Sequence, residues 1–481
     1  MSRRTMRRGL AVFATLAALV GCATNPVTGR KEVSLVGSGQ EQQMGDEGYK
    51  AVVAEYGLYD DAELRTVIER VGGRVAAVSH LPNQKWTFTL VDDPAVNAFA
   101  MPGGYIYVTR GMLAHLQSEA QLAGVLGHEI GHVTARHSAR QITNQQLAGI
   151  GLGVASMLSP TFQRYGGLAQ QALGLMFLKY GRDDETQADE LGVSYATKAG
   201  YDSREIPDTY AMLRRLSERS GQRLPTFLST HPDPGDRQRR TAELAQAAVA
   251  GRTDLAINER PYLERLDGVV YGRDPRNGYF DGTRYYHPGL RFEITFPSGW
   301  QTQDTRNAVM AAEPNERGVM QLTMAPKSAH SPAEQVTQLE RDGQITGSRG
   351  RTETIGGYPA WVGEVGVRSS DGTESVLAAA WIRKSPDVMF QILGRGEQPG
   401  DAYEARVLEA ARSLRDLTDP QRINVQAWVV DVVSVPHSGA FGDVVAALGP
   451  FAIPLDEEAI INQRETSSET VQSGQLLKIV R

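Results

Sequence analysis

The hydrophobic residues between positions 118 and 134 follow the period of a helix. They recur three or four residues apart and form one apolar stripe, made of Leu122, Val125, Leu126, Ile130 and Val133. Ser118 precedes this stripe and Gln121 stands three positions later, which is the spacing of a helix-capping box. We therefore predict a helix that begins after Ser118 and buries one side.

A different pattern marks residues 97–109. Short runs rich in Phe, Tyr, Ile and Val flank Pro102-Gly103-Gly104, a combination that favours a turn between two strands. This pattern predicts a hairpin from Asn97 to Thr109. A plain surface hairpin without a binding role is the alternative.

Alternating apolar and polar residues predict strands in the second half of the chain. Leu290, Phe292, Ile294 and Phe296 alternate with polar residues, and strand-like runs follow at 319–324, 360–367 and 376–393. Helical periodicity appears at 332–341 and 403–414. These runs predict a small α+β domain over residues 285–418. Its sequence contains no metal cluster, nucleophile dyad or phosphate loop, so we expect an accessory or interaction role.

Length and composition divide the chain into about three domains. The chain has 481 residues, and its composition shifts to Gly, Asp, Arg and Tyr after residue 250, as in a linker. We expect a signal peptide at 1–21, a first domain at 22–250, a linker at 251–284, the α+β domain at 285–418 and a C-terminal module at 419–481. The expected fold class is α+β, with a mostly helical first domain that includes a small edge sheet.

The C-terminal module has a weak resemblance of its own. Its ending, Ser473-Gly-Gln-Leu-Leu-Lys-Ile-Val480, resembles a LysM-type module, the kind that binds peptidoglycan. The match is degenerate, because Phe441-Gly-Asp-Val444 stands where such a module usually begins Pro-Gly-Asp-Thr. A folded module that binds no carbohydrate is the alternative.

The predicted helix at 118–134 carries a metal-binding pattern. A helix turns about 100° per residue, so His128 and His132 lie roughly 40° apart on one face and can bind one metal ion. Glu129 stands beside them, where its carboxylate can take a proton from a metal-bound water, as the general base of a zinc peptidase does. The alternative is a core helix whose two histidines are hydrogen-bonded inside the protein.

A catalytic zinc site needs a third protein ligand. The metzincin extension fails here, because Ser138 occupies the position of its third histidine and Ala135 that of its glycine. Glu185 and Asp189 are the next candidates, because they are four residues apart and therefore share a helix face. One carboxylate can bind the metal while the other holds a ligand histidine by its second ring nitrogen. A solvated acidic face is the alternative.

Several motifs, in the same order, are shared with a known family. Leu126-Gly-His-Glu-Ile-Gly-His-Val133, followed by Asp184-Glu-Thr-Gln-Ala-Asp-Glu-Leu-Gly192, resembles the HtpX and CAAX-prenyl-protease family of gluzincin metallopeptidases, especially its soluble periplasmic branch. Further matches are Asn25-Pro-Val-Thr-Gly29, Asn97-Ala-Phe-Ala-Met-Pro-Gly-Gly104 and Ser229-Thr-His-Pro-Asp-Pro234. The branch type that the chain most resembles carries tetratricopeptide repeats after its catalytic domain, and no internal repeat is evident here. The resemblance therefore leaves the partners open.

The resemblance implies a complete site. It makes His128, His132 and Glu185 the ligands of one Zn²⁺ per chain and Glu129 the base. Asp189 would then orient a ligand histidine. Asn97 and Ala98 match the edge strand of the family, which is expected to pair with the substrate backbone as an added strand.

His231 and Arg237 have roles that remain open. In the periplasmic branch, a histidine in a Thr-His-Pro loop fills the fourth zinc position and keeps the protease shut, and Thr230-His231-Pro232 matches that loop. In the competing role, His231 or Arg237 stabilises the oxyanion of the tetrahedral intermediate. A loop histidine without a metal role is the third alternative for His231.

The N-terminus has the pattern of a bacterial lipoprotein signal. Four arginines at positions 3, 4, 7 and 8 precede a short apolar run, and Leu19-Val20-Gly21-Cys22 follows as a lipobox. The run is too short to span a bilayer, so we interpret it as a signal peptide. Cys22, the only cysteine, would then carry the lipid, and a free thiol is the alternative. Ala23 after the cysteine favours the outer membrane.

Charge and motifs together define the expected function. Removal of residues 1–21 leaves 46 basic against 56 acidic residues, a formal charge of −10, which argues against nucleic-acid binding. We expect a lipid-anchored zinc endopeptidase on the periplasmic face of the bacterial envelope, and the resemblance implies misfolded or misassembled envelope proteins as substrates. The alternatives are a holdase or assembly factor with little proteolytic activity and a protein tethered to peptidoglycan.

Overall fold

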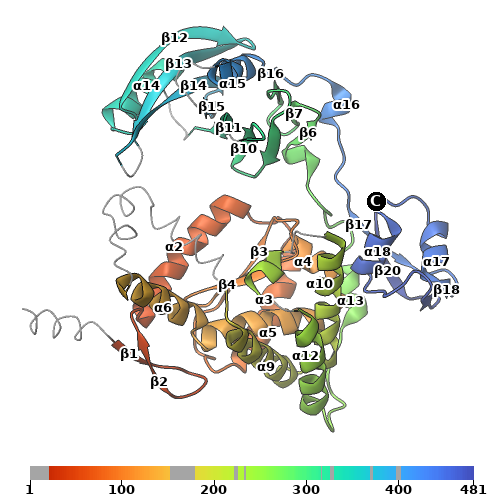
Figure 1. The fold of residues 1–481 in the computed structure, drawn as a ribbon. Coiled ribbons are helices and arrows are strands. Elements are labelled where there is room, and N and C mark those ends of the chain that lie inside the picture. Colours follow the sequence, from red (N-terminus) through yellow and green to blue (C-terminus); the bar gives the residue numbers. More distant parts are fainter. Residues whose placement is uncertain are drawn as a thin grey trace, which may run out of the picture. The chain divides into compact units, whose positions relative to one another are not determined.

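The computed structural model describes residues 21–151, 179–220, 226–231, 234–315, 317–325, 330–368, 372–396 and 402–481 (Figure 1). The chain forms two compact units: unit 1 combines Met1–Arg273 with Trp428–Arg481, and unit 2 is Asp274–Ala427. The predicted signal peptide lies outside the described residues, apart from Gly21. Both units mix helices and sheets, so the predicted α+β class is confirmed.

Unit 1 begins with a hairpin that is fixed to the rest of the unit. Strands β1 (Gly21–Thr24) and β2 (Lys31–Ser34) pair in antiparallel register. In the turn between them, Asn25 Oδ1 accepts hydrogen bonds from the amides of Val27 at 2.9 Å and Thr28 at 3.1 Å. Asn25 Nδ2 donates to the carbonyl oxygen of Ala135 at 3.1 Å. The hairpin is therefore anchored at the end of the helix that carries the histidines.

Most of unit 1 is helical. Among the described residues up to Arg273, its helices are α2 (Ser38–Tyr56), α3 (Ala62–Ala77), α4 (Arg110–His115), α5 (Glu119–Thr134), α6 (His137–Gly151), α9 (Arg182–Lys198), the 3-10 turn η1 (Ser203–Glu205), α10 (Ile206–Ser220), α11 (Thr226–Thr230), α12 (Pro234–Ala248) and α13 (Glu259–Glu264). Helix α5 begins after Ser118, as predicted, and Ser118 Oγ accepts from the amide of Gln121 at 3.1 Å. The Gln121 side chain caps the amide of Gln117 at 2.8 Å instead of completing the box with Ser118.

A three-stranded sheet lies beside α5 and contains the predicted hairpin. Its order is β3 (Thr87–Val91), β5 (Tyr105–Thr109), β4 (Ala98–Met101), so β4 is an edge strand. Strand β4 pairs with β5 in antiparallel register, from Ala98 with Val108 to Met101 with Tyr105. Gly103 and Gly104 make the turn with φ values of 84° and 90°, a region that glycine adopts readily. The hairpin prediction is confirmed.

Helices α5 and α9 approach each other closely through glycines. A Cβ atom at Gly127 would lie 3.0 Å from the carbonyl oxygen of Gly192, and one at Gly192 would lie 3.0 Å from the amide nitrogen of His128. Larger residues would therefore push the two helices apart. This contact brings the carboxylates of α9 to the histidines of α5.

The C-terminal residues of unit 1 form a small folded segment. Strands β17 (Val430–Ser434) and β20 (Leu476–Val480) pair in antiparallel register, and between them lie β18 (Gly439–Ala440), α17 (Phe441–Ala447), α18 (Leu455–Ile461) and β19 (Thr470–Val471). We expected a separate module here, but its buried residues Val430, Ile460 and Val480 belong to the same apolar core as α5. The segment predicted as a linker also differs, because Tyr262 and Leu263 of α13 are buried in that core.

Unit 2 contains the predicted second α+β domain with shifted bounds. A seven-stranded sheet has the order β12-β13-β14-β15-β11-β10-β9, and a four-stranded sheet has the order β16-β8-β7-β6. The elements are η2 (Pro275–Asn277), β6 (Tyr279–Asp281), β7 (Arg284–His287), β8 (Phe292–Thr295), β9 (Gln301–Asp304), β10 (Ala308–Ala312), β11 (Val319–Met324), α14 (Pro332–Arg341), β12 (Gly347–Ile355), β13 (Tyr358–Arg368), β14 (Glu374–Ser385), β15 (Val388–Arg395), α15 (Ala402–Arg412), β16 (Arg415–Asp416) and α16 (Pro420–Ile423). The run predicted at 376–393 is two strands, β14 and β15, joined by a short turn.

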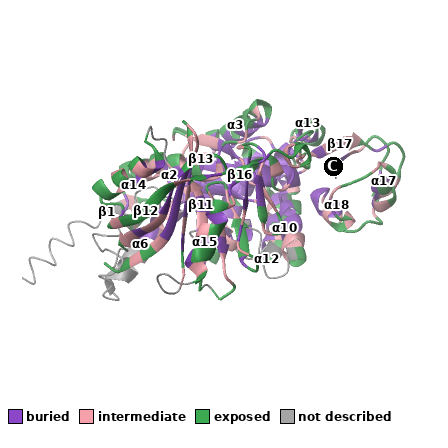
Figure 2. Cartoon of the chain, turned by 90° about the horizontal axis from the view of Figure 1, so that it is seen from above, coloured by how far each residue is buried: buried purple, intermediate pink, exposed green. Residues whose placement is uncertain are grey.

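Burial in α5 extends beyond the predicted stripe, because the helix is buried on every side and only Val133, a member of that stripe, is half-buried. Figure 2 shows the buried residues along the chain. Leu122, Leu126 and Ile130 of α5 are fully buried. Among the described residues, no helix has both the length and the apolar character needed to cross a bilayer.

Candidate metal centre

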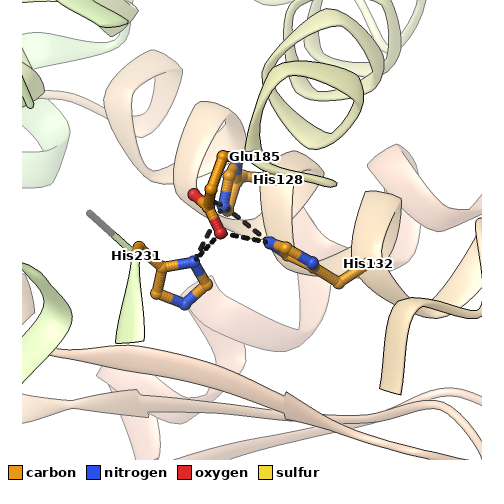
Figure 3. A group of neighbouring side chains, drawn as sticks. All are labelled: His128, His132, Glu185 and His231. Atoms are coloured by element: carbon orange, nitrogen blue, oxygen red, sulfur yellow. Dashed lines mark hydrogen bonds and ion pairs between the residues drawn. The ribbon is translucent and has the colours of Figure 1, made fainter. Parts of the chain in front are cut away.

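Four side chains from three separate segments converge at the middle of unit 1. His128 and His132 come from α5, Glu185 from α9, and His231 from the residue that follows α11 (Figure 3). One ligand atom from each lies within 4.8 Å of the others, and all four residues are buried. The structure thus brings together the three side chains proposed as ligands, and adds the histidine whose role was open.

The distances within this cluster fit a bound cation. His132 Nε2 lies 3.0 Å from His128 Nε2 and 3.5 Å from Glu185 Oε1. Ligand atoms about 2.0–2.1 Å from a tetrahedral zinc are separated by about 3.3 Å, so these spacings match. Two imidazole lone pairs that face each other and a carboxylate repel one another unless a positive charge lies between them. The residues present therefore fit a metal ion.

Asp189 fixes the orientation of His128. Its Oδ1 lies 3.1 Å from His128 Nδ1, so the proton of this imidazole belongs on Nδ1 and the lone pair on Nε2. Burial lowers the pKa of His128, but Asp189 and Glu185 outweigh burial and raise this pKa to about 9. The same negative field that favours an imidazolium favours a metal cation. Asp189 therefore lies where the sequence predicted it.

His137 and Gln187 fix the orientation of His132 in a similar way. His137 Nδ1 lies 2.8 Å from His132 Nδ1, and His137 Nε2 lies 3.0 Å from Gln187 Oε1. The Gln187 oxygen can only accept, so His137 carries its proton on Nε2 and accepts from His132 Nδ1–H. This leaves the Nε2 lone pair of His132 directed at the cluster. Burial holds the pKa of His132 well below its ordinary value, which keeps the imidazole neutral.

Arg237 lies behind the ligands and is engaged by carboxylates. Its Nη2 donates to Asp189 Oδ1 at 2.7 Å, its Nε to Asp189 Oδ2 at 3.0 Å, and its Nη1 lies 2.7 Å from Glu185 Oε2. Tyr210 Oη donates to Asp189 Oδ1 at 2.7 Å, and the Arg237 guanidinium lies over the Tyr210 ring. This geometry favours a role in orienting the ligands over the oxyanion role that the sequence left open for Arg237.

Glu129 differs from the other polar residues of the site. Both its carboxylate oxygens are buried and have no hydrogen-bond partner among the described residues. His231 Nε2 lies 3.7 Å from Glu129 Oε1. Burial raises the pKa of Glu129 above its ordinary value. A carboxylate in these surroundings is ready to accept a proton from a group that enters the site.

His231 is held in the cluster by its own segment. Its Nδ1 lies 2.9 Å from Glu185 Oε1 and 3.3 Å from His128 Nε2. Its ring stacks on Phe227 with centroids 4.5 Å apart, and the carbonyl oxygen of Thr230 accepts from the amide of Tyr180 at 3.3 Å. The Nδ1 atom of His231 therefore lies at the position of a fourth metal ligand.

The remaining predicted residues lie on the edge strand and at the N-terminus. Ala98 begins β4 and is fully buried, while Asn97 precedes it with an Oδ1 atom that has no hydrogen-bond partner among the described residues. Cys22 lies in β1 opposite Val33. Neither the lipid nor the substrate contact is tested by these positions, so both stay predictions.

Sequence reasoning missed three side chains of the site. Tyr180 stacks on the His132 ring with centroids 3.9 Å apart, Tyr210 binds Asp189, and Gln187 orients His137. Gln187 is two residues after Glu185, and residues two apart do not share a helix face, so helical spacing carried no signal for it. Tyr180 and Tyr210 have no motif and become visible only in the fold.

Comparisons with known proteins agree with this geometry. The family described as Peptidase family M48 matches residues 62–245. The mitochondrial metalloendopeptidase OMA1 of Schizosaccharomyces pombe is 31% identical over 256 residues, which are 51% of this chain and 73% of that protein. OMA1 of Arabidopsis thaliana is 34% identical, over 46% of this chain and 43% of that protein. The beta-barrel assembly-enhancing protease of Escherichia coli K12 is 30% identical, over 44% of this chain and 45% of that protein. The chain thus spans less than half of the plant and Escherichia coli proteins.

Proposed function

Because the chain belongs to peptidase family M48 and its site is that of a metalloendopeptidase, we propose that it is a zinc-dependent endopeptidase of the bacterial cell envelope. The observation that carries this proposal is the convergence of His128, His132 and Glu185 beside an unpartnered Glu129. Three protein ligands and one base are the parts that a catalytic zinc site requires. One zinc per chain would be held by these three residues.

The side chains of the site have distinct tasks in this proposal. Zinc, when bound, polarises the scissile carbonyl and lowers the pKa of a water molecule. Glu129 accepts a proton at its carboxylate and returns it to the leaving amine. Asp189 and His137 hold the two ligand histidines in the tautomer that presents Nε2. Arg237 compensates the charge of Asp189 and Glu185, so these two carboxylates tolerate burial together.

Latency is part of the proposal. His231 Nδ1 lies close enough to Glu185 and His128 to complete a tetrahedral donor set. A fourth protein ligand leaves no open position for water or substrate. In this state the enzyme is shut, and its activation requires withdrawal of the His231 segment.

The envelope location and the substrates rest on the sequence and on the relatives. The lipobox before Cys22 favours a lipid anchor and an outer-membrane location. The name of the Escherichia coli relative refers to beta-barrel assembly, so misfolded or misassembled envelope proteins are the proposed substrates. Lipidation predicts that the N-terminal peptide gains the mass of a diacylglycerol. Replacement of Cys22 by alanine would release the protein from membranes if the proposal holds.

The central test uses the chain without residues 1–21. We expect about one zinc per chain by elemental analysis and cleavage of an unfolded protein substrate, with Glu129→Gln retaining zinc but losing cleavage. If the enzyme is latent, His231→Ala raises the cleavage rate, whereas the control His437→Ala, at an exposed loop histidine, leaves it unchanged. Cleavage that survives in Glu129→Gln would refute the mechanism, and indifference to His231→Ala would refute latency.

Two alternatives have their own outcomes in the same experiment. A holdase or assembly factor would bind zinc and prevent aggregation of an unfolded protein, yet neither the wild type nor His231→Ala would cleave it. A peptidoglycan-tethered protein would sediment with isolated peptidoglycan, whereas a protein without this role would stay in the supernatant.

A further inference from the structure

A cavity of about 210 Å³ lies beside His132. Its walls come from the N-terminal hairpin, the start of α2, the loop before β3, the turn after β4, the end of α5 and the start of α6, represented by Thr24, Glu41, Leu81, Pro102, Arg136 and Ser138. It is smaller than the roughly 300–1,000 Å³ of small-molecule sites, and its size suits one amino-acid side chain. Segments from six parts of unit 1 thus line a space that touches a proposed metal ligand.

The cavity lies where a bound polypeptide would pass. Strand β4 ends at Met101, and the cavity wall begins with the next two residues, Pro102 and Gly103. A chain that pairs with β4 and continues past Met101 toward His132 reaches this wall. Alternate side chains of an extended chain point to the same side, so one side chain next to the scissile bond faces the cavity.

The walls are held in place before any substrate arrives. A Cβ atom at Gly103 would lie 3.0 Å from the Cα atom of Gln42, so this turn is pressed against α2. Gln84 Nε2 donates to the carbonyl oxygen of Gly103 at 2.8 Å. Arg136 has a φ of 56°, which is uncommon for a residue other than glycine, and its Nη2 donates to the carbonyl oxygen of Val36 at 2.9 Å. Pre-formed walls are typical of binding sites.

The charges of the cavity compensate each other. Arg136 Nε donates to Glu41 Oε1 at 3.1 Å, and both side chains are mostly buried. Apolar atoms of Pro26, Leu81 and Val133 make up other parts of the wall. A charged substrate side chain would lose its hydration here without gaining a free counter-ion. The chemistry therefore fits a neutral side chain.

We propose that this cavity is a substrate subsite that accepts one neutral side chain adjacent to the scissile bond, and that the hairpin following Cys22 forms one of its walls. The proposal rests on the proposed peptidase function. It also gives the N-terminal hairpin a role in specificity, because Asn25 fixes this hairpin to Ala135 at the end of the metal-binding helix. The segment that carries the predicted lipid would then help to select the substrate.

The test measures binding and cleavage separately. The probes are fluorescent hexapeptides that differ at a single position, and binding is measured with the chain from residue 22 carrying both Glu129→Gln and His231→Ala, which opens the site but does not turn over. Cleavage specificity is measured in the His231→Ala background. Two substitutions fill the cavity from opposite walls, Thr24→Trp and Leu81→Trp. The control is Ala77→Trp, which adds similar bulk at an exposed position of α3 that lies outside this cavity.

The expected result is specific to one substrate position. Both filling variants should bind peptides with Leu, Phe or Met at that position about tenfold more weakly, while peptides with Ala there bind as before. Glu41→Gln should create a preference for Asp or Glu at the same position, because it leaves the Arg136 guanidinium without its partner. Ala77→Trp should change neither preference. Unfolding temperatures of all variants identify any that fail to fold.

Several outcomes would overturn the subsite. The subsite would be refuted if Thr24→Trp and Leu81→Trp weakened the binding of every peptide equally or weakened none. It would also be refuted if the two variants affected different peptide positions, or if Glu41→Gln brought no gain in binding for peptides with acidic side chains. Absence of peptide binding to the protein with both Glu129→Gln and His231→Ala would also overturn it. Failure of the peptidase proposal is distinguishable, because it appears as a zinc-loaded His231→Ala protein that binds peptides with the expected preference but does not cleave them.

Discussion

Two buried glutamates of helix α5, Glu119 near its N-terminal end and Glu129 toward its C-terminal end, differ in their hydrogen bonding. At the N-terminal end, Glu119 contacts Arg70 and accepts from Asn258, and Gln121 exchanges hydrogen bonds with Gln463. Toward the C-terminal end, both carboxylate oxygens of Glu129 lack a hydrogen-bond partner among the described residues. Satisfied polar groups stabilise a fold, whereas unsatisfied ones cost stability and are kept where a ligand will meet them. The helix is thus anchored at one end and prepared for chemistry at the other.

Further residues that anchor the N-terminal end of α5 come from the far end of the sequence. Lys478 Nζ, which is fully buried, donates to the carbonyl oxygens of Ala114 at 2.7 Å and Leu116 at 2.9 Å, just before α5. Gln117 Nε2 donates to the carbonyl oxygen of Ile461 at 2.6 Å. These contacts explain why the C-terminal segment belongs to unit 1. A helix that must hold ligands in fixed positions gains from a rigid attachment at its other end.

The largest expected effect concerns Glu129, whose carboxylate has no hydrogen-bond partner among the described residues. Glu129→Gln should lower the cleavage rate about a thousandfold or more, because the amide cannot accept the proton. The same substitution should leave the unfolding temperature of the zinc-free protein unchanged or higher, because a buried carboxylate without partners costs more than a buried amide. Activity assays and calorimetry on one preparation measure both. A clear loss of stability in Glu129→Gln would contradict the contrast between the two ends.

The second effect concerns Lys478. Lys478→Ala removes two hydrogen bonds to backbone carbonyls and leaves a cavity, so we expect the free energy of unfolding of unit 1 to fall by about 3 kcal/mol. Lys478→Met fills most of the space and should cost less. Thermal and denaturant unfolding measure the change, and Ala446→Ser at an exposed position of α17 is the control. An unchanged stability in Lys478→Ala would mean that the C-terminal segment does not anchor α5.

The third effect is a dependence of stability on pH. Glu458 is buried beside Lys478 and Arg481 and accepts from the amide of Val480 at 2.9 Å; burial raises its pKa to about 7. The unfolded chain releases this proton near the ordinary glutamate pKa of 4.5, so the folded state holds more protons between pH 4.5 and 7. The contribution of Glu458 is therefore greatest below pH 4.5 and falls as the pH rises through 7, by up to about 3 kcal/mol. Chemical denaturation from pH 4.5 to 8 should show this decline in the wild type and not in Glu458→Gln; parallel curves would refute it.

The sequence predicted which residues of α5 form the metal site, but not which residues hold this helix in place. The positions of His128, Glu129 and His132 follow from helical spacing alone, and the spacing of Glu185 and Asp189 predicted a second helix face. The strands of unit 2 were also visible, because alternation is a local property of the chain. In each case, the residues that form the pattern lie within a single helix or strand.

Contacts between distant segments were not predictable in this way. Lys478 lies in the apolar run Leu-Leu-Lys-Ile-Val, where a lysine would ordinarily be expected to reach solvent, and nothing local names its carbonyl partners. Residues 251–273 have the composition of a linker, yet Tyr262 is buried and its hydroxyl donates to the carbonyl oxygen of Leu113 at 2.8 Å. Periodicity tells which side of an element is buried but not what covers it.

The smallest expected effect tests the attachment at a single pair of side chains. Gln121 Nε2 donates to Gln463 Oε1 at 2.7 Å, and Gln463 Nε2 donates to Gln121 Oε1 at 3.0 Å. A double-mutant cycle with Gln121→Ala and Gln463→Ala should give a coupling energy of about 1 kcal/mol. Gln463 has a φ of 52°, a conformation that glycine adopts more easily, so Gln463→Gly should destabilise less than Gln463→Ala although both lose the amide. Equal losses would mean that backbone strain at Gln463 contributes nothing, and additive effects of the two alanine substitutions would mean that the amide pair does not join the C-terminal segment to α5.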